Sequence, residues 1–341
     1  MKPISVITAA AVVLAAALAP AQAQTVLTAS SWAPPGQTLT AKILVPWTKE
    51  VEKATQGRVK FNLLPKPPVA PAQTFDGVRD GMVDVSFAVH GYNPGRFLLT
   101  KATEFAFLGD SAETVSVAYQ RIYERRMAQH NEHAGVKVIG VYSHGPGQIY
   151  TVKKPVAALA DMANLKMRVG GGVVNDYAKA MGAVPLLKPS SEAFQLLQSG
   201  VADGIFFPSE SILGFKLTGV IRHVTLIPGG IYNASLVMLM NQARFDALPK
   251  ADQDAINRVS GEFFARLAGK AWDSSDAEGL AAMKTAGIQV VRASPAFVAE
   301  LKKAIDPVEQ AWYAELKAKG VDGAALMEEF RAEIKRVAAG N

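Results

Sequence analysis

Apolar and polar residues alternate at positions 165–169, and this period of two predicts a strand with one buried face. Three glycines follow this segment, and residues 173–182 have the pattern of a short helix that a glycine closes. Arg168 is therefore expected near the carboxyl end of a strand, just before a strand-to-helix turn. In open α/β sheets, that end of the strand is where ligands bind.

The same periodicities divide the rest of the chain into alternating strands and helices. Residues 26–29 and 59–63 carry strand patterns on either side of a helical pattern at 38–56, which Gly57 ends. This order predicts a β-α-β unit with a parallel pair of strands. Further strands are predicted at 83–89, 136–142, 149–152, 224–227, 236–240 and 288–291, and further helices at 72–79, 111–133, 250–286, 295–320 and 322–339.

A motif that occurs twice in the sequence indicates two similarly built halves. A helix, a tight Gly-x-x-Asp turn and a buried strand around Gly81 recur around Gly200. Glycine is favoured in turns that follow helices, so part of this match is expected by chance. We interpret it as a two-lobed α/β chain, an arrangement in which a ligand binds between the lobes. The matching residues are Phe75, Val78, Gly81, Val83, Asp84 and Phe87 in the first copy, and Phe194, Leu197, Gly200, Ala202, Asp203 and Phe206 in the second.

The predicted helix at 250–286 would be about 50 Å long, which is longer than one domain is wide. We expect residues 24–149 to form the first lobe, with residues 232–270 returning to it, and residues 150–231 to form the second. Residues from about 271 to 341 are expected to supply the long helix and the C-terminal helices that pack across both lobes.

The N-terminus has the pattern of a secretory signal. Lys2 supplies a positive charge, residues 4–18 are almost wholly apolar, and Ala21-Gln22-Ala23 is a small-x-small cleavage site. The apolar run is too short to span a bilayer securely, and no second run follows it. We therefore predict a Sec-type signal, cleavage after Ala23, and a periplasmic chain of 318 of the 341 residues that does not span the membrane.

Composition excludes several classes of function. The net charge of +6 is small and spread along the chain, so no nucleic-acid partner is expected. The chain has no cysteine, which excludes disulfides, thiolate metal sites and a cysteine nucleophile. Hydrophobic residues make up 49% of the sequence, which is ample for a core that must be stable without disulfides.

Arg168 is the strongest candidate for a ligand-binding residue. Its guanidinium offers a planar fork of donors that a carboxylate meets with two parallel hydrogen bonds. The alternative from the residues alone is an arginine on a solvated edge, paired with a nearby acidic side chain.

Other candidate motifs are weaker. The glycines at 170–172 lack the GxGxxG spacing of a dinucleotide site, and no P-loop or GxSxG elbow is present. His130 and His133 are expected to share a helix face, but their polar neighbours favour a solvated surface over a metal site. No catalytic residue, cofactor or metal is expected.

Taken together, these segments resemble one known family. The chain is similar, from about residue 25 to residue 330, to the DctP-type solute-binding proteins of tripartite ATP-independent periplasmic (TRAP) transporters. Eight stretches carry this resemblance in the order found in the family. They are VEKATQGRV (51–59), VRDGMVDV (78–85), YNPGRF (92–97), FAFL (105–108), GVKVIG (135–140), NLKMRV (164–169), SEAFQLLQSGVADG (191–204) and NQARFDALP (241–249).

The resemblance implies an α/β, two-lobed periplasmic binding protein fold, type II-like, with a long helix spanning both lobes. It also implies that the protein is not an enzyme, and that it holds an organic anion in the interlobe cleft and delivers it to a small and a large membrane subunit. The carboxylate-binding arginine of the family falls on Arg168.

The other cleft positions differ from those of relatives that bind sugar acids, where they are largely polar. Here they are matched by Trp32, Val89 and Phe207, and by Gly147 and the loop at 70–71. We therefore expect an apolar or aromatic monocarboxylate. A 2-keto or 2-hydroxy group on it could be met by Gln148 or Asn233. Tyr92 completes the predicted ligand-binding set, although core packing is the alternative for each aromatic residue.

Three alternatives remain open from the sequence. The ligand could be a C4-dicarboxylate, although a second cation to bind it is not apparent. The protein could instead present its ligand to a signalling receptor. It could also be a periplasmic enzyme built on a binding-protein scaffold.

Overall fold

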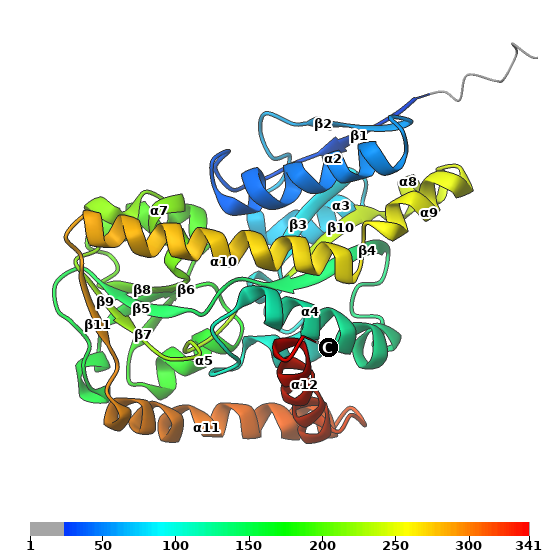
Figure 1. The fold of residues 1–341 in the computed structure, drawn as a ribbon. Coiled ribbons are helices and arrows are strands. Elements are labelled where there is room, and N and C mark those ends of the chain that lie inside the picture. The colour runs from blue at the N-terminus through cyan, green and yellow to red at the C-terminus, as the bar shows by residue number, and fades with distance from the viewer. Residues whose placement is uncertain (1–23, 341) are drawn as a thin grey trace, which may run out of the picture.

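The computed structural model describes residues 24–340, and the predicted signal peptide lies outside this range. Two separate sheets, each with helices packed against it, give the chain two lobes (Figure 1). The two-lobed α/β fold expected from the sequence is thereby confirmed.

The first sheet contains five strands in the order β2-β1-β3-β10-β4. Its first two strands pair in parallel, as the β-α-β pattern predicted, and β10 is antiparallel to both of its neighbours. The chain therefore returns to this sheet after it has built most of the second one. The strands are β1 (Thr25–Ala29), β2 (Val59–Leu63), β3 (Val85–Val89), β4 (Val136–Ser143) and β10 (Ser235–Asn241).

The second sheet contains six strands in the order β11-β9-β5-β8-β6-β7. Sequence patterning missed β7, because Pro185 lies inside it and proline is confined to edge strands, which is where β7 lies. The strands are β5 (Gln148–Thr151), β6 (Lys166–Val169), β7 (Val184–Leu187), β8 (Gly204–Phe207), β9 (His223–Leu226) and β11 (Gln289–Arg292).

The helices cover the sheets and connect them. The α-helices that precede β9 in the chain are α2 (Val45–Ala54), α3 (Thr74–Arg79), α4 (Ala112–Ile122), α5 (Val173–Ala180), α6 (Ala193–Gln198) and α7 (Ser209–Gly214). Those that follow are α8 (Gln242–Asp246), α9 (Lys250–Arg258), α10 (Glu262–Thr285), α11 (Pro295–Lys317) and α12 (Gly323–Ala338).

The repeated sequence motif corresponds to two equivalent turns. Gly81 follows α3 and Gly200 follows α6, with backbone φ angles of 78° and 74°. Both angles lie in the left-handed region that favours glycine, and each turn leads into a strand of its own sheet, β3 or β8. The repeated motif therefore marks the same helix-to-strand corner in the two lobes.

The single helix predicted at 250–286 is wrong in one respect. It is divided into α9 and α10, because Gly261 has a φ of 59° and its N–H donates to the Ile139 carbonyl at 2.7 Å. The expectation that a long helix spans both lobes is met by α10, which lies across them (Figure 1).

Two aspartates of α10 tie it to a helix in each lobe. Asp273 accepts hydrogen bonds at the start of α4, from Ser111 Oγ and the Ala112 N–H. Asp276 accepts one from the Glu210 N–H in the first turn of α7 at 2.7 Å. N–H groups in the first turn of a helix have no partner within that helix, and the two aspartates supply partners for them. These bonds attach α10 to both lobes.

The helix predicted at 111–133 ends earlier than expected. After α4 the chain makes one π turn and one 3₁₀ turn, and Asn131, with a φ of 58°, ends the run. His133 is buried, with Nε2 2.8 Å from His90 Nε2 and Nδ1 3.2 Å from the Tyr123 hydroxyl. The expected solvated surface is therefore wrong for His133, and the two histidines share no helix face.

The close packing of α10 on α4 predicts that Gly269→Ala destabilises the protein. A methyl group there would lie 2.3 Å from Glu113 Cα, which is backbone and cannot move away alone. Alanine favours a helix over glycine by about 1 kcal/mol, but overpacking costs about 1–3 kcal/mol. We expect a net loss in the free energy of unfolding, measured by urea denaturation.

The matched control is Ser274→Ala on the exposed face of α10, which should change stability little. A Gly269→Ala protein as stable as the wild type would contradict this packing.

Candidate ligand-binding site

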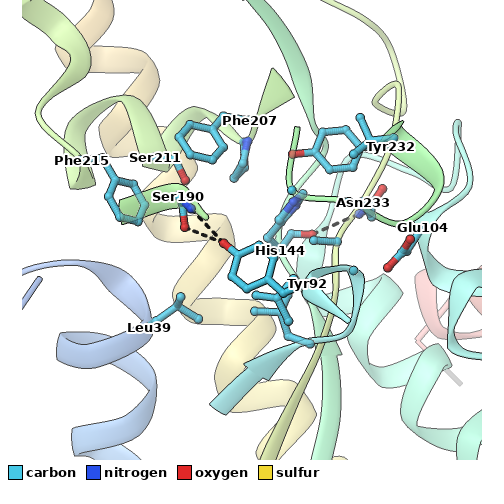
Figure 2. Close-up of a pocket in the computed structure, with 18 of the residues that line it drawn as sticks. Leu39, Tyr92, Glu104, His144, Ser190, Phe207, Ser211, Phe215, Tyr232 and Asn233 are labelled. Carbon is cyan, nitrogen blue, oxygen red and sulfur yellow. Dashed lines mark hydrogen bonds between the residues drawn. The ribbon is translucent and has the colours of Figure 1, made fainter. Parts of the chain in front are cut away.

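A cavity lies between the lobes, at the carboxyl ends of several strands. Arg168 is on β6, Phe207 ends β8, Val89 ends β3, and Trp32 and Tyr92 lie just beyond β1 and β3. Counted together with the open solvent at its mouth, the space between these side chains is about 550 Å³. Figure 2 shows side chains from both lobes surrounding it.

The Arg168 guanidinium is the charged group at the centre of this site. The residue is 2% exposed, and its Nε donates to the Lys188 carbonyl at 2.8 Å. Its Nη2 has no hydrogen-bond partner among the residues that the structure describes. Its Cζ lies 4.8 Å from the centroid of the Phe207 ring. No carboxylate among residues 24–340 forms an ion pair with it. A buried cation without a counterion is costly, so the site is arranged for an anion.

The alternation at 165–169 placed Arg168 on the polar face of its strand, and the structure corrects what that face meets. Met167, Arg168 and Val169 are all buried. Strand β6 lies inside the sheet, between β7 and β8. Met167 and Val169 belong to the hydrophobic core, Arg168 lines the cavity, and Lys166, on the same face as Arg168, is exposed. Arg168 therefore does not lie on a solvated edge.

The walls of the cavity are mainly aromatic and aliphatic. Trp32 packs against Tyr92 with ring centroids 5.9 Å apart, and Phe207 stacks on Phe215 at 5.7 Å. Val89 completes this apolar lining. Such walls favour a ligand with an apolar or aromatic body, which gains by leaving water.

Three contacts join the lobes around the cavity. The Tyr92 hydroxyl is 2.9 Å from Ser190 Oγ and accepts from the Ser190 N–H at 3.0 Å (Figure 2). Gln37 Nε2 donates to the Glu210 carboxylate at 3.1 Å. Glu104 accepts from the Val173 N–H, at the start of α5, at 2.8 Å. These bonds hold the cleft closed.

Burial shifts the pKa values of two groups that line the cavity. It raises the pKa of the Glu104 carboxyl from its ordinary 4.5 to about 7, although the Val173 N–H bond opposes the shift. It lowers the pKa of His144 to about 4, and the neighbouring charge of Arg168 acts in the same direction. His144 is therefore neutral at pH 7, while Glu104 is poised between its two forms.

The structure brings six of the seven predicted site residues together. They are Arg168, Phe207, Trp32, Val89, Tyr92 and Asn233.

The seventh predicted site residue, Gln148, does not line the cavity. Its amide oxygen accepts from the Ile227 N–H at 2.6 Å, and the side chain lies at a separate surface hollow. The loop at 70–71 and Gly147 are likewise not among the residues that line the cavity.

Several lining residues were not found from the sequence. Ser190 follows β7, a strand that was itself missed, and Ser211 lies on α7, just after β8. Their place beyond strand ends is the signal that could have identified them. Glu104 and Trp272 reach the cavity from helical segments whose patterns are those of ordinary packing, so the sequence held no signal for them.

Residues 29–316 match the family model described as bacterial extracellular solute-binding protein, family 7, also named DctP. The chain belongs to the DctP family of TRAP solute-binding proteins. It is thus a periplasmic solute-binding protein, in a family that is not enzymatic.

Solved structures of TRAP solute-binding proteins are similar along nearly the whole chain. One from Bordetella bronchiseptica, with bound (R)-mandelate and (S)-mandelate, is 47% identical, with a TM-score of 0.89 over 92% of this chain and 99% of that one. One from a marine metagenome, specific for aromatic acid ligands, is 32% identical, with a TM-score of 0.87 over 92% and 99%. One from Rhodoferax ferrireducens, with copurified benzoate, is 27% identical, with a TM-score of 0.88 over 93% and 99%.

Two further observations concern the described part of this TRAP solute-binding protein. Within residues 24–340, no helix is long and apolar enough to cross a membrane. The same residues contain no group of three or more His, Cys, Asp or Glu side chains placed to hold a metal ion.

The raised pKa of Glu104 predicts a pH-dependent stability that Glu104→Gln removes. Because the folded pKa of about 7 lies above the ordinary value, the stability present below about pH 4.5 is lost as the pH rises through 7. The variant should therefore gain stability relative to wild type between about pH 5 and pH 8, by about 2–3 kcal/mol. Denaturation across this range measures it.

Glu328→Gln, at an exposed position of α12, controls for the loss of one negative charge. A constant difference between the Glu104→Gln protein and wild type at all pH values would show that Glu104 does not titrate in this window.

Proposed function

We propose that this protein is the receptor for a small aromatic monocarboxylate, such as mandelate or benzoate. The observation that carries the proposal is the buried Arg168 guanidinium, which has an unpartnered Nη2 and no carboxylate partner among residues 24–340. A ligand carboxylate would supply the missing counterion and accept from the guanidinium. The ligands bound by similar proteins from Bordetella, the metagenome and Rhodoferax support the same class.

A C4-dicarboxylate fits this cavity poorly. Arg168 is the one Arg or Lys side chain among the described residues that line it. A second carboxylate would therefore be buried without a cation, and near Glu104 it would meet an acidic group. A sugar acid would bury several hydroxyls against Trp32, Val89 and Phe207, at about 1–3 kcal/mol for each one left unpaired.

We further propose how the receptor is used. A signal cleaved after Ala23 would release the chain into the periplasm, where it would deliver its ligand to the small and large TRAP membrane subunits. Segments of the two lobes pair where the chain crosses between them, with the Gly147 N–H donating to the Tyr232 carbonyl at 2.8 Å. This pair of crossings, near residues 150 and 232, is the proposed hinge and the proposed boundary between the lobes.

The anchor is tested by replacing Arg168 and titrating four acids. Wild type should bind mandelate and benzoate more tightly than succinate and galacturonate in calorimetry. Arg168→Met should lose about 2–5 kcal/mol of binding free energy for the aromatic acids, the usual loss when one partner of a buried charge pair is removed. Arg168→Lys keeps the charge without the planar fork and should also bind more weakly.

Arg222→Lys is the matched control, since Arg222 is exposed and also donates to backbone carbonyls. Wild type that binds only succinate or galacturonate tightly would refute the ligand class. Unchanged affinity in Arg168→Met would refute the anchor.

Closure is tested at Tyr92, whose hydroxyl contacts Ser190 across the cleft. Tyr92→Phe removes two hydrogen bonds that form only when the lobes meet, each worth about 0.5–1.5 kcal/mol. The bound acid should dissociate several-fold faster in stopped-flow measurements, with little change in the association rate. Small-angle scattering should show the radius of gyration of wild type decreasing on ligand binding. A dissociation rate unaffected by the substitution, or no decrease in radius at saturation, would contradict a closing cleft.

A further inference from the structure

Three buried side-chain polar atoms at the cavity have no hydrogen-bond partner within the described part of the chain, residues 24–340. Two are donors, Arg168 Nη2 and Trp272 Nε1, and one is an acceptor, Asn233 Oδ1. Leaving buried polar groups unpaired is costly, and such groups in native proteins commonly await a ligand or water. Donors suit the oxygens of a carboxylate, whereas the acceptor requires a ligand group that carries a hydrogen.

The orientation of the Asn233 amide is fixed by its neighbours. Asn233 is 1% exposed, and its Nδ2 donates to the His144 carbonyl at 3.1 Å (Figure 2). The same Nδ2 donates to Ser143 Oγ at 3.2 Å. A backbone carbonyl can only accept, and the Ser143 hydroxyl already donates to that same carbonyl. Both amide hydrogens are therefore engaged, and the carbonyl oxygen is the atom of this side chain left for a ligand.

Asn233 lines the same cavity as Arg168. It follows Tyr232 in the chain and is bonded to the backbone of His144. The charge of Arg168 acts on the pKa of both neighbours, lowering that of His144 in addition to burial and opposing the rise that burial causes in Tyr232. A ligand whose carboxylate meets Arg168 therefore shares its cavity with Asn233 Oδ1, which is free to meet a substituent on the adjacent carbon.

We propose that Asn233 Oδ1 accepts a hydrogen bond from a hydroxyl group on the carbon next to the ligand carboxylate, and so selects 2-hydroxy acids. This inference rests on the proposed function. A 2-keto acid would place a second acceptor opposite Oδ1, and an acid without the hydroxyl would leave Oδ1 unpaired. Sites built to bond a hydroxyl discriminate against analogues that lack it.

The test compares acids that share one phenyl ring. The ligands are (R)-mandelate, (S)-mandelate, phenylacetate and benzoylformate, titrated by calorimetry at one pH. In wild type, the better mandelate enantiomer should bind about three- to tenfold more tightly than phenylacetate, the usual effect of one neutral hydrogen bond. It should also bind more tightly than benzoylformate.

The variant Asn233→Ala should remove this preference. Its affinity for mandelate should fall to about that of phenylacetate, while phenylacetate binding changes less than about twofold. Gln148→Ala is the matched control, because Gln148 is also a buried amide bonded to backbone but does not line the cavity. Its mandelate-to-phenylacetate ratio should equal that of wild type.

The outcomes separate this inference from the proposed function. If all four acids bind wild type equally, or benzoylformate binds best, the proposed function stands and the role of Asn233 is refuted. If Asn233→Ala weakens every acid by the same factor, Asn233 only supports the wall, and the inference is again refuted. If no acid binds wild type, both proposals fail. If the variant does not fold, the order of the acids in wild type decides alone.

Discussion

The buried, unpaired charge of Arg168 is the constraint on which the rest of the site depends. Its cost is limited by the Lys188 carbonyl and by the face of the Phe207 ring. Neither contact neutralises the charge. A structure that holds a cation in an apolar cavity sacrifices stability for function, and it recovers that stability when an anion binds.

Two of the three glycines after β6 allow the lobes to close over that charge. A side chain at Gly171, whose φ is 80°, would lie 2.0 Å from the Gly91 carbonyl oxygen of the other lobe. One at Gly172 would lie 2.0 Å from the Glu104 carboxylate that caps α5. These glycines do not form a phosphate cradle. They permit two backbones to approach closely enough to enclose a small ligand.

Sequence patterning predicted most of the fold, because strands buried on one face and helices with one apolar face have distinct periods. It also placed Arg168 at a strand end, where the cavity forms. It failed where tertiary contacts override local pattern. Pro185 made the edge strand β7 unrecognisable as a strand from its sequence pattern, and Gly261, with its positive φ, divides the predicted long helix in two.

Two of the cavity-lining residues that patterning missed share one property. Glu104 and Trp272 line the cavity because segments distant in the chain pack together there: Glu104 meets the Val173 N–H at the start of α5, and Trp272 lies on α10. The opposite error occurred at Gln148, which was predicted to bind the ligand. Its side chain is held away from the cavity by its hydrogen bond to the Ile227 N–H.

The most direct test of the central claim is a crystal structure of the protein with mandelate bound. The account predicts that the carboxylate lies within hydrogen-bonding distance of Arg168 Nη2, with the phenyl ring against Trp32 and Phe207. A structure in which the carboxylate meets a different donor, while Arg168 keeps only its bond to the Lys188 carbonyl, would contradict it.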